Sequence, residues 1–261
     1  MNSKYFLYID ILGFKDLVPL GQKRVHELYQ LINALNVHDH YAFSVLVFSD
    51  TILVYNKTDP INDHDHSCIV MYAIEFVKDL LYRLIGKDIF FRATLRYDEF
   101  NHFKLSNLNA FYGPALIEAH RDEKINTGTG LLLHKTVWAR NDIFKTVYFS
   151  DEYCFVFLNQ TLDTVLGQYG PNVPFSVSGT DFENQDFPLD IAKDVIFLKS
   201  IYQNMLEHPD PQVRTKFLTT WQMYRTRFGA ILDALEKSSF NPKVLVPSLD
   251  WSKYINQAIE K

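Results

Sequence analysis

Short apolar runs along the chain alternate with longer stretches in which apolar residues recur at helical spacing. The first run, residues 4–12, is almost unbroken and rich in aromatic and β-branched side chains, which is typical of a strand buried on both faces. Residues 43–48 and 51–55 are separated by only two residues and predict a hairpin. Strand-like runs are found at 4–12, 43–48, 51–55, 90–97, 131–133, 146–150 and 153–158.

Helices are predicted where the apolar period lengthens to three or four residues. One such helix begins after Gly113-Pro114, since proline is tolerated in a first helical turn. The expected helices are 21–37, 69–86, 114–124, 188–206 and 211–237. Strands and helices in this order predict an α+β fold with a mostly antiparallel sheet, covered by helices and followed by a C-terminal helical extension.

The segment 168–187 interrupts this pattern, because it is rich in Gly, Pro and Ser and has no apolar period. We therefore expect three parts: a core domain at 1–167, a linker at 168–187 and a helical extension at 188–261.

Composition narrows the class of protein. Of the 261 residues 47% are hydrophobic, which excludes a disordered chain, and the net charge of −5 provides no basic field for nucleic acid or an anionic membrane. Cys68 and Cys154 are far apart and form no metal or disulfide pattern. With no signal-peptide core and no apolar run of about 20 residues, we expect a soluble, unprocessed protein of the cytoplasm.

Two carboxylates stand next to strand ends in apolar surroundings, Asp10 in YIDILGF and Asp50 in FSDT. If the first strand and the hairpin are neighbours in one sheet, both acids emerge at the same edge, where oxygen ligands suit Mg²⁺ or Mn²⁺. The alternative is that Asp10 bonds local amides and Asp50 is an ordinary turn residue.

Four segments resemble motifs of the class III nucleotidyl cyclases, and the resemblance covers about 4–160. Residues 8–14 (YIDILGF) look like the F-x-D-I-x-G-F motif, and 48–51 (FSDT) is similar to the second metal motif. Residues 91–95 (FRATL) resemble the R-x-G-I strand, and 113–121 (GPALIEAHR) resemble G-x-x-V-N-x-A-x-R.

The resemblance implies a class III cyclase-like, ferredoxin-type antiparallel sheet, with 1–167 as the catalytic domain. It also implies two divalent ions, Mn²⁺ or Mg²⁺, held by Asp10, the backbone carbonyl of Ile11 and Asp50. Arg121 of a partner subunit would steady the α-phosphate in the transition state. The nucleotide-binding residues implied are Phe14, Leu46, Arg92, Ala110 and Arg121.

Departures from the motifs refine this expectation. Ile117 stands where the family has the asparagine that orients the ribose, and neither Leu46 nor Ala110 can hydrogen-bond a purine edge. The combination of YID-x-LGF, FSD and G-P-A-L-x-E-A resembles the bacterial pyrimidine nucleotide cyclases of the Pycsar anti-phage defence system. This implies a homodimeric phosphorus–oxygen lyase that converts UTP to cyclic UMP, with shared active sites and a separate effector protein. A cytidylate cyclase making cyclic CMP, or a catalytically silent nucleotide-sensing and dimerisation module, are the alternatives.

Other polar groups are given structural roles. Arg92 has the alternative of pairing with Asp98 or Glu99 at a strand edge. His64 and His66 lie in a polar segment and are predicted to be solvated loop residues, since a zinc site usually needs four ligands.

Overall fold

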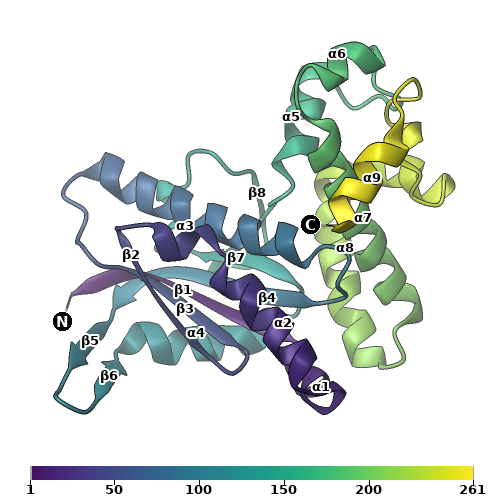
Figure 1. Cartoon of the computed structure of the whole chain (residues 1–261). Helices are drawn as coiled ribbons and strands as arrows, with labels where there is room; N and C mark the ends of the chain where they lie inside the picture. Colours follow the sequence, from purple (N-terminus) through teal and green to yellow (C-terminus); the bar gives the residue numbers. More distant parts are fainter. Residues whose placement is uncertain (1, 261) are drawn as a thin grey trace. The chain divides into compact units, whose positions relative to one another are not determined.

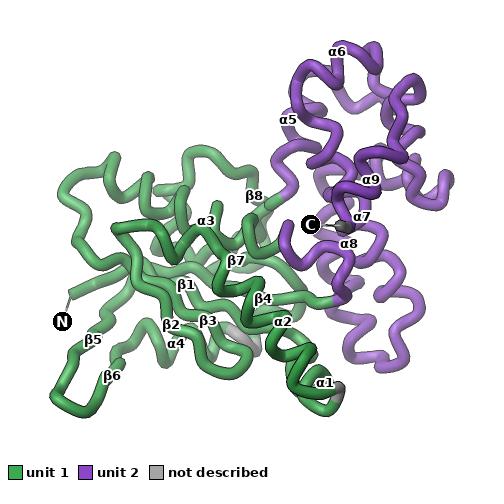
Figure 2. The backbone as a smooth tube through the Cα atoms, viewed as in Figure 1, with its two compact units in different colours: residues 1–81, 89–158 green, residues 82–88, 159–261 purple. Residues whose placement is uncertain are grey.

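A computed structural model describes residues 2–260 and contains two compact units (Figure 2). The sheet unit comprises Met1–Leu81 and Ile89–Leu158, and the helical unit comprises Tyr82–Asp88 and Asn159–Lys261. The segment 168–187, expected to be a linker, therefore lies within the helical unit.

The sheet unit is built on a seven-stranded mixed sheet with the order β2-β3-β1-β4-β7-β9-β8 (Figure 1). Neighbouring strands are antiparallel except for β4 and β7, which are parallel. The strands are β1 (Ser3–Leu12), β2 (Phe43–Phe48), β3 (Thr51–Asn56), β4 (Phe90–Glu99), β7 (Gly130–His134), β8 (Thr146–Tyr148) and β9 (Tyr153–Val156). The predicted α+β class is confirmed.

Strand β1 lies between β3 and β4, which explains its unbroken apolar sequence. Successive side chains point to opposite faces, so that Phe6 and Tyr8 share one face. They form a buried cluster with Ala115 and Ala119 of helix α4 (Pro114–Ile125). Helix α3 (Asp63–Leu84) covers the opposite face of the sheet (Figure 1).

The remaining helices of the sheet unit are α1 (Phe14–Leu17) and α2 (Gln22–Asn33), with short 3₁₀ turns at Val18–Leu20, Asn36–Asp39 and Trp138–Arg140. Helix α3 begins earlier than the apolar period indicates. The Asn62 side chain accepts a 2.9 Å hydrogen bond from the Asp65 N–H, and Asp63 and Asp65 occupy the first turn. An N-cap and acidic residues stabilise a helix start, which is why the polar residues before Ile69 are helical.

Strands β5 (Asn101–Lys104) and β6 (Asn109–Tyr112) form a separate two-stranded hairpin that projects from the sheet (Figure 1). Gly113 joins β6 to α4 with a φ of 145°. A Cβ atom at this position would lie 2.4 Å from the backbone oxygen of Glu99. Only glycine allows this close approach of the two backbones.

The helical unit contains the two helices expected at 188–206 and 211–237, as α7 (Pro188–Glu207) and α8 (Pro211–Lys237). They pack through aromatic side chains, with the rings of Tyr202 and Trp221 5.1 Å apart. The unit also contains α5 (Gln160–Tyr169), α6 (Gly179–Glu183), a 3₁₀ turn at Pro242–Val244 and α9 (Trp251–Glu260). In the described part of the chain, no helix combines the length and apolar character that a membrane span requires.

Candidate active site

Asp10 lies near the end of β1, where the register places it opposite Thr51 of β3 and Arg92 of β4. It is only 8% exposed. The Arg92 Nε donates a 2.8 Å hydrogen bond to Asp10 Oδ2. A carboxylate in such a position needs a compensating charge, and the neighbouring strand supplies one.

Asp50 lies in the tight turn between β2 and β3, where Ser49 has a left-handed φ of 54°. Tyr29 of α2 donates a 3.0 Å hydrogen bond to the Ser49 carbonyl and holds the turn. The Ile11 N–H donates a 2.9 Å hydrogen bond to the Asp50 carbonyl. The two acids therefore come from backbone positions that adjoin at one sheet edge.

The donor atoms at this edge suit a hard divalent cation. Asp10 and Asp50 offer carboxylate oxygens, and because a strand residue presents its N–H and carbonyl to the same side, the Ile11 carbonyl faces the Asp50 turn. Among residues 2–260, no group of three or more His, Cys, Asp or Glu side chains is arranged to hold a metal. Magnesium is usually held by one or two carboxylates together with water and substrate phosphates, so two protein acids fit such an ion.

Gly13 and Phe14 carry the chain out of β1. Gly13 has a left-handed φ of 75°, which ends the strand and starts α1. Phe14 is buried, and its ring lies 6.2 Å from that of Tyr29. The packing of α1 against α2 accounts for this side chain.

Leu46 and Ala110, the two positions expected to contact the nucleotide base, lie on different elements. Leu46 of β2 is opposite Leu53, which is opposite Tyr8, so Leu46 shares the sheet face of Asp10. It is half-buried against the cluster under α4. Ala110 is also half-buried, but it lies on the β5–β6 hairpin.

Arg121 lies on the exposed side of α4, with its side chain 66% exposed. Its guanidinium is 3.0 Å from Glu118 one turn earlier, and Ile117 is also exposed. Within one chain, the structure joins Asp10 to Arg92 and gives Arg121 a partner on its own helix.

Comparisons with known proteins were made on sequence and on structure. No family model matches the chain, and no curated protein matches it. Among solved structures, the chain is similar to the adenylyl cyclase CyaB from P. aeruginosa, with 14% identity and a TM-score of 0.44, over 59% of this chain and 93% of that one. It is also similar to the dimeric guanylyl cyclase domain of the RhoGC fusion protein from the aquatic fungus Blastocladiella emersonii, with 12% identity and a TM-score of 0.46, over 59% and 93%.

A third similar structure is the guanylate cyclase domain of RhGC from Catenaria anguillulae in complex with GTP, with 10% identity and a TM-score of 0.43, over 60% of this chain and 96% of that one. Similarities this distant do not assign a substrate. The function must therefore be inferred from the residues of this chain.

A buried polar network under α4 was not anticipated from the sequence. The Arg96 guanidinium of β4 binds Asp122 of α4 at 2.7 Å and Asp98 at 3.3 Å. The Tyr153 hydroxyl hydrogen-bonds Asp122, and burial raises the pKa of both groups. Burial also lowers the pKa of the neighbouring His134, with a further lowering from Arg96. The sequence signal for this network is Arg96, a charged residue within an otherwise apolar strand.

The two histidines expected in a loop are helical instead, because α3 starts at Asp63. His66 Nδ1 is 2.5 Å from the Tyr5 hydroxyl, and His64 Nε2 is 3.4 Å from the Cys68 sulfur. Both imidazoles therefore have neighbours within the sheet unit.

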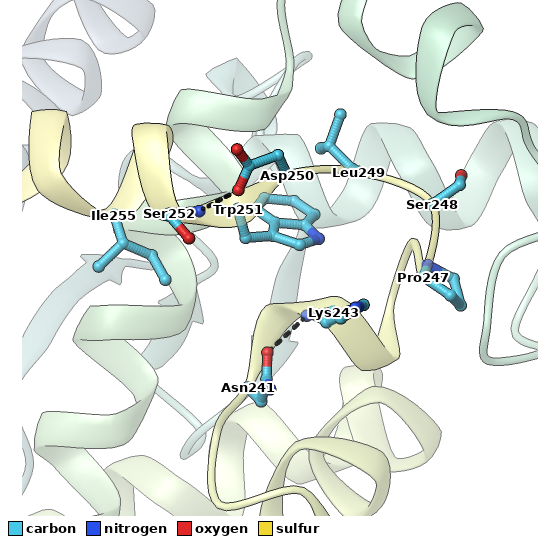
Figure 3. A pocket seen from close by; sticks show the side chains of 9 residues that line it. All are labelled: Asn241, Lys243, Pro247, Ser248, Leu249, Asp250, Trp251, Ser252 and Ile255. Carbon is cyan, nitrogen blue, oxygen red and sulfur yellow. Dashed lines mark hydrogen bonds between the residues drawn. The ribbon is translucent and has the colours of Figure 1, made fainter.

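The helical unit contains a hollow of about 460 Å³ (Figure 3). Asn241, Lys243, Ser248, Asp250 and Trp251 are among its lining residues. The Asp250 carboxylate accepts a 3.1 Å hydrogen bond from the Ser252 N–H, and the Asn241 side chain accepts one of 3.0 Å from the Lys243 N–H. These two side chains cap local turns, which is a structural role.

Proposed function

We propose that the chain is a class III nucleotide cyclase that converts UTP to 3′,5′-cyclic UMP and pyrophosphate. The observation that carries the proposal is the 2.9 Å hydrogen bond between Ile11 and Asp50, because it brings together the two acid-bearing motifs of the sequence. Two acids at one sheet edge, in motifs of this order, are what phosphoryl transfer at a divalent cation requires.

Asp10, Asp50 and the Ile11 carbonyl are the groups that would hold Mn²⁺ or Mg²⁺. When bound, such ions lower the free energy of ionising a ribose hydroxyl and neutralise a triphosphate. In the proposed reaction the 3′-oxygen forms a bond to the α-phosphorus, the bond to the β-phosphate oxygen breaks, and pyrophosphate and the hydroxyl proton leave. Arg92 adds positive charge beside Asp10, where the phosphates would bind.

We propose a homodimer in which Arg121 of one subunit serves the Asp10 and Asp50 edge of the other. Arg121 is exposed and available to a second copy. The β5–β6 hairpin adds apolar side chains that a partner would cover, since exposed apolar groups gathered on one element mark interaction sites. These are Phe103, Leu105, Leu108 and Tyr112, each 43–56% exposed.

The choice of a pyrimidine rests on the absence of purine-reading side chains at Leu46 and Ala110. Leu46 shares the sheet face of Asp10, which supports a base placed near it. Cytosine differs from uracil only at N3 and the 4-position, so CTP is the alternative substrate. The proposal includes a cytoplasmic protein whose cyclic nucleotide activates a separate effector during phage infection.

A second candidate is a silent module that binds nucleotide or another subunit without turnover. Two observations favour it: the Asp10 carboxylate already has a guanidinium counter-charge from Arg92, and the exposed residue four before Arg121 is Ile117 rather than a polar one. Such a module would have the same fold but no cyclase activity.

The deciding experiment is incubation of the purified full chain with each of the four ribonucleoside triphosphates and Mn²⁺, followed by separation of the products. A cyclic pyrimidine monophosphate from one substrate supports the cyclase and identifies the base. A cyclic purine would contradict the argument from Leu46 and Ala110. A folded protein with no product from any substrate would favour the silent module.

A further inference from the structure

Helix α4 is tied to the sheet by a buried ion pair. Asp122 is 3% exposed and Arg96 is 6% exposed. The Arg96 Nη1 donates a 2.7 Å hydrogen bond to Asp122 Oδ2, and Nη2 reaches Asp98 at 3.3 Å. One guanidinium of β4 therefore binds a carboxylate on the helix and another on its own strand.

A third group, from β9, also binds Asp122. The Tyr153 hydroxyl of β9 hydrogen-bonds the Asp122 carboxylate. His134 of β7 stands opposite Tyr153 in the register, with the two rings 5.2 Å apart. Asp122 is thus held by groups from β4 and β9, with β7 between those two strands.

The other contacts between α4 and the sheet are mostly apolar, apart from the buried Asn126 at the C-terminal end of the helix, which donates a 3.4 Å hydrogen bond to the Ala93 carbonyl of β4. Ala115 and Ala119 pack on the apolar side chains of Phe6 and Tyr8. Small apolar residues give close contact but little directional restraint, whereas hydrogen bonds to a carboxylate fix both distance and angle. The bonds to Asp122 therefore restrain the rotation of α4 and its shift along the sheet.

The rotation of α4 decides where Arg121 points. Neighbouring residues on a helix are about 100° apart around its axis, so Asp122 facing the sheet places Arg121 toward solvent. We propose that Asp122 and Arg96 are positioning residues, which fix the direction of Arg121 for the phosphoryl transfer. This inference rests on the proposed function, in which Arg121 acts on the α-phosphate.

The test is a double-mutant cycle on kcat with Arg121→Ala, Asp122→Asn and the two combined. We expect Arg121→Ala to lower kcat about 100-fold and Asp122→Asn about 10-fold, with KM within about twofold of wild type. If Asp122 acts through Arg121, the double variant is no slower than Arg121→Ala alone. Effects that multiply, to about 1000-fold, would overturn the positioning role, because they are what an independent structural defect produces.

A structural readout accompanies the kinetics. We expect the amide hydrogens of α4 to exchange faster in Asp122→Asn than in wild type, while the control Asp59→Asn, which breaks an exposed ion pair with Lys4, leaves them unchanged. Unchanged exchange in Asp122→Asn would overturn the anchoring. If Asp122→Asn does not fold, the paired variant Arg96→Met with Asp122→Leu replaces it in the same cycle, since an apolar pair removes the bonds without leaving a buried charge.

The two proposals fail in different ways. Turnover by the wild type together with multiplying effects contradicts the positioning role alone. No turnover by a folded wild-type protein contradicts the proposed function, and the positioning role with it.

Discussion

Arg92 and Asp10 are joined by a 2.8 Å hydrogen bond across two neighbouring strands, although they are 82 positions apart in the sequence. Asp98, one of the two partners that the sequence offered for Arg92, is bound by Arg96 instead. The register of β1 and β4 explains the pairing, because Asp10 lies directly opposite Arg92. Asp10 of the YIDILGF segment is therefore stabilised by Arg92 of the FRATL segment.

Replacing this arginine tests the electrostatics of the site without any turnover assay. With both side chains no more than 16% exposed, we expect Arg92→Met to lower the free energy of unfolding by about 1–3 kcal/mol. A divalent cation would then supply the missing positive charge, so Mn²⁺ should raise the thermal unfolding midpoint of Arg92→Met more than that of wild type. Calorimetry with and without Mn²⁺ measures both effects.

The matched control for Arg92→Met is Arg140→Met, which removes an arginine from an ion pair with the exposed Asp63. An exposed pair contributes little, so the free energy of unfolding should change much less than in Arg92→Met, with no added response to Mn²⁺. Equal responses of the two variants to Mn²⁺ would argue against a cation near Asp10.

Asp50→Ala should leave a folded protein with no cyclase turnover. The side chain is half-buried in a turn, and the hydrogen bond from Ile11 to its main-chain carbonyl survives the substitution. Loss of one of two metal-holding carboxylates should lower kcat by about 1000-fold or more. Product formation with Mn²⁺ and circular dichroism of the same sample are the measurements. Asp59→Asn is the control, and wild-type-like turnover by Asp50→Ala would remove Asp50 from the site.

Gly113→Ala should destabilise the sheet unit strongly. The added Cβ would lie 2.4 Å from the Glu99 backbone oxygen, and the φ of 145° is unfavourable for alanine. We expect a loss of about 2–4 kcal/mol in the free energy of unfolding, measured by urea denaturation. The same substitution at Gly167, inside α5 with nothing within 4 Å of the new Cβ, should instead stabilise by about 0.5–1 kcal/mol. Equal effects at both sites would mean that the β6–α4 junction tolerates a side chain.

Local patterns predicted most elements of the fold. The buried strand β1, the β2–β3 hairpin and the helices α7 and α8 follow from apolar periodicity, which reports which faces are covered. The start of α3 was not predicted, because its first residues are polar and are held in the helix by capping from Asn62 and not by apolar packing. Helix α9 was not predicted, although Trp251, Tyr254 and Ala258 are buried on one face of it at helical spacing.

The candidate site was predictable in part. Asp10 and Asp50 stand out as acids among apolar neighbours, and pairing of β1 with the hairpin places them at one edge. The ion pairs of Arg92 and Arg96 were not predictable, since they depend on the register between strands and on where α4 lies over the sheet. A charged residue can be predicted from the sequence to be buried only when its strand is known to be central in the sheet.

The buried network under α4 predicts a pH dependence of stability through His134. The backbone N–H of Thr136 points to His134 Nδ1 at 3.4 Å, which favours a neutral ring with an unprotonated Nδ1. Burial and the nearby Arg96 both lower the pKa of this histidine below its usual 6.5, with Asp122 and Glu152 acting in the opposite direction. His134 is therefore protonated at a lower pH in the folded protein than in the unfolded chain.

The sign follows from which state binds the proton first. Above pH 6.5 both states are neutral at this residue and the contribution to stability is complete. As the pH falls below 6.5 the unfolded chain is protonated first, so stability decreases until the lower pKa of the folded state is reached. We expect the urea midpoint of wild type to fall between pH 7.5 and pH 5.5, and that of His134→Gln to fall less. His40, whose pKa is also lowered by burial, is present in both proteins and cancels in the comparison. Parallel pH profiles for the two proteins would show that His134 is not the titrating group.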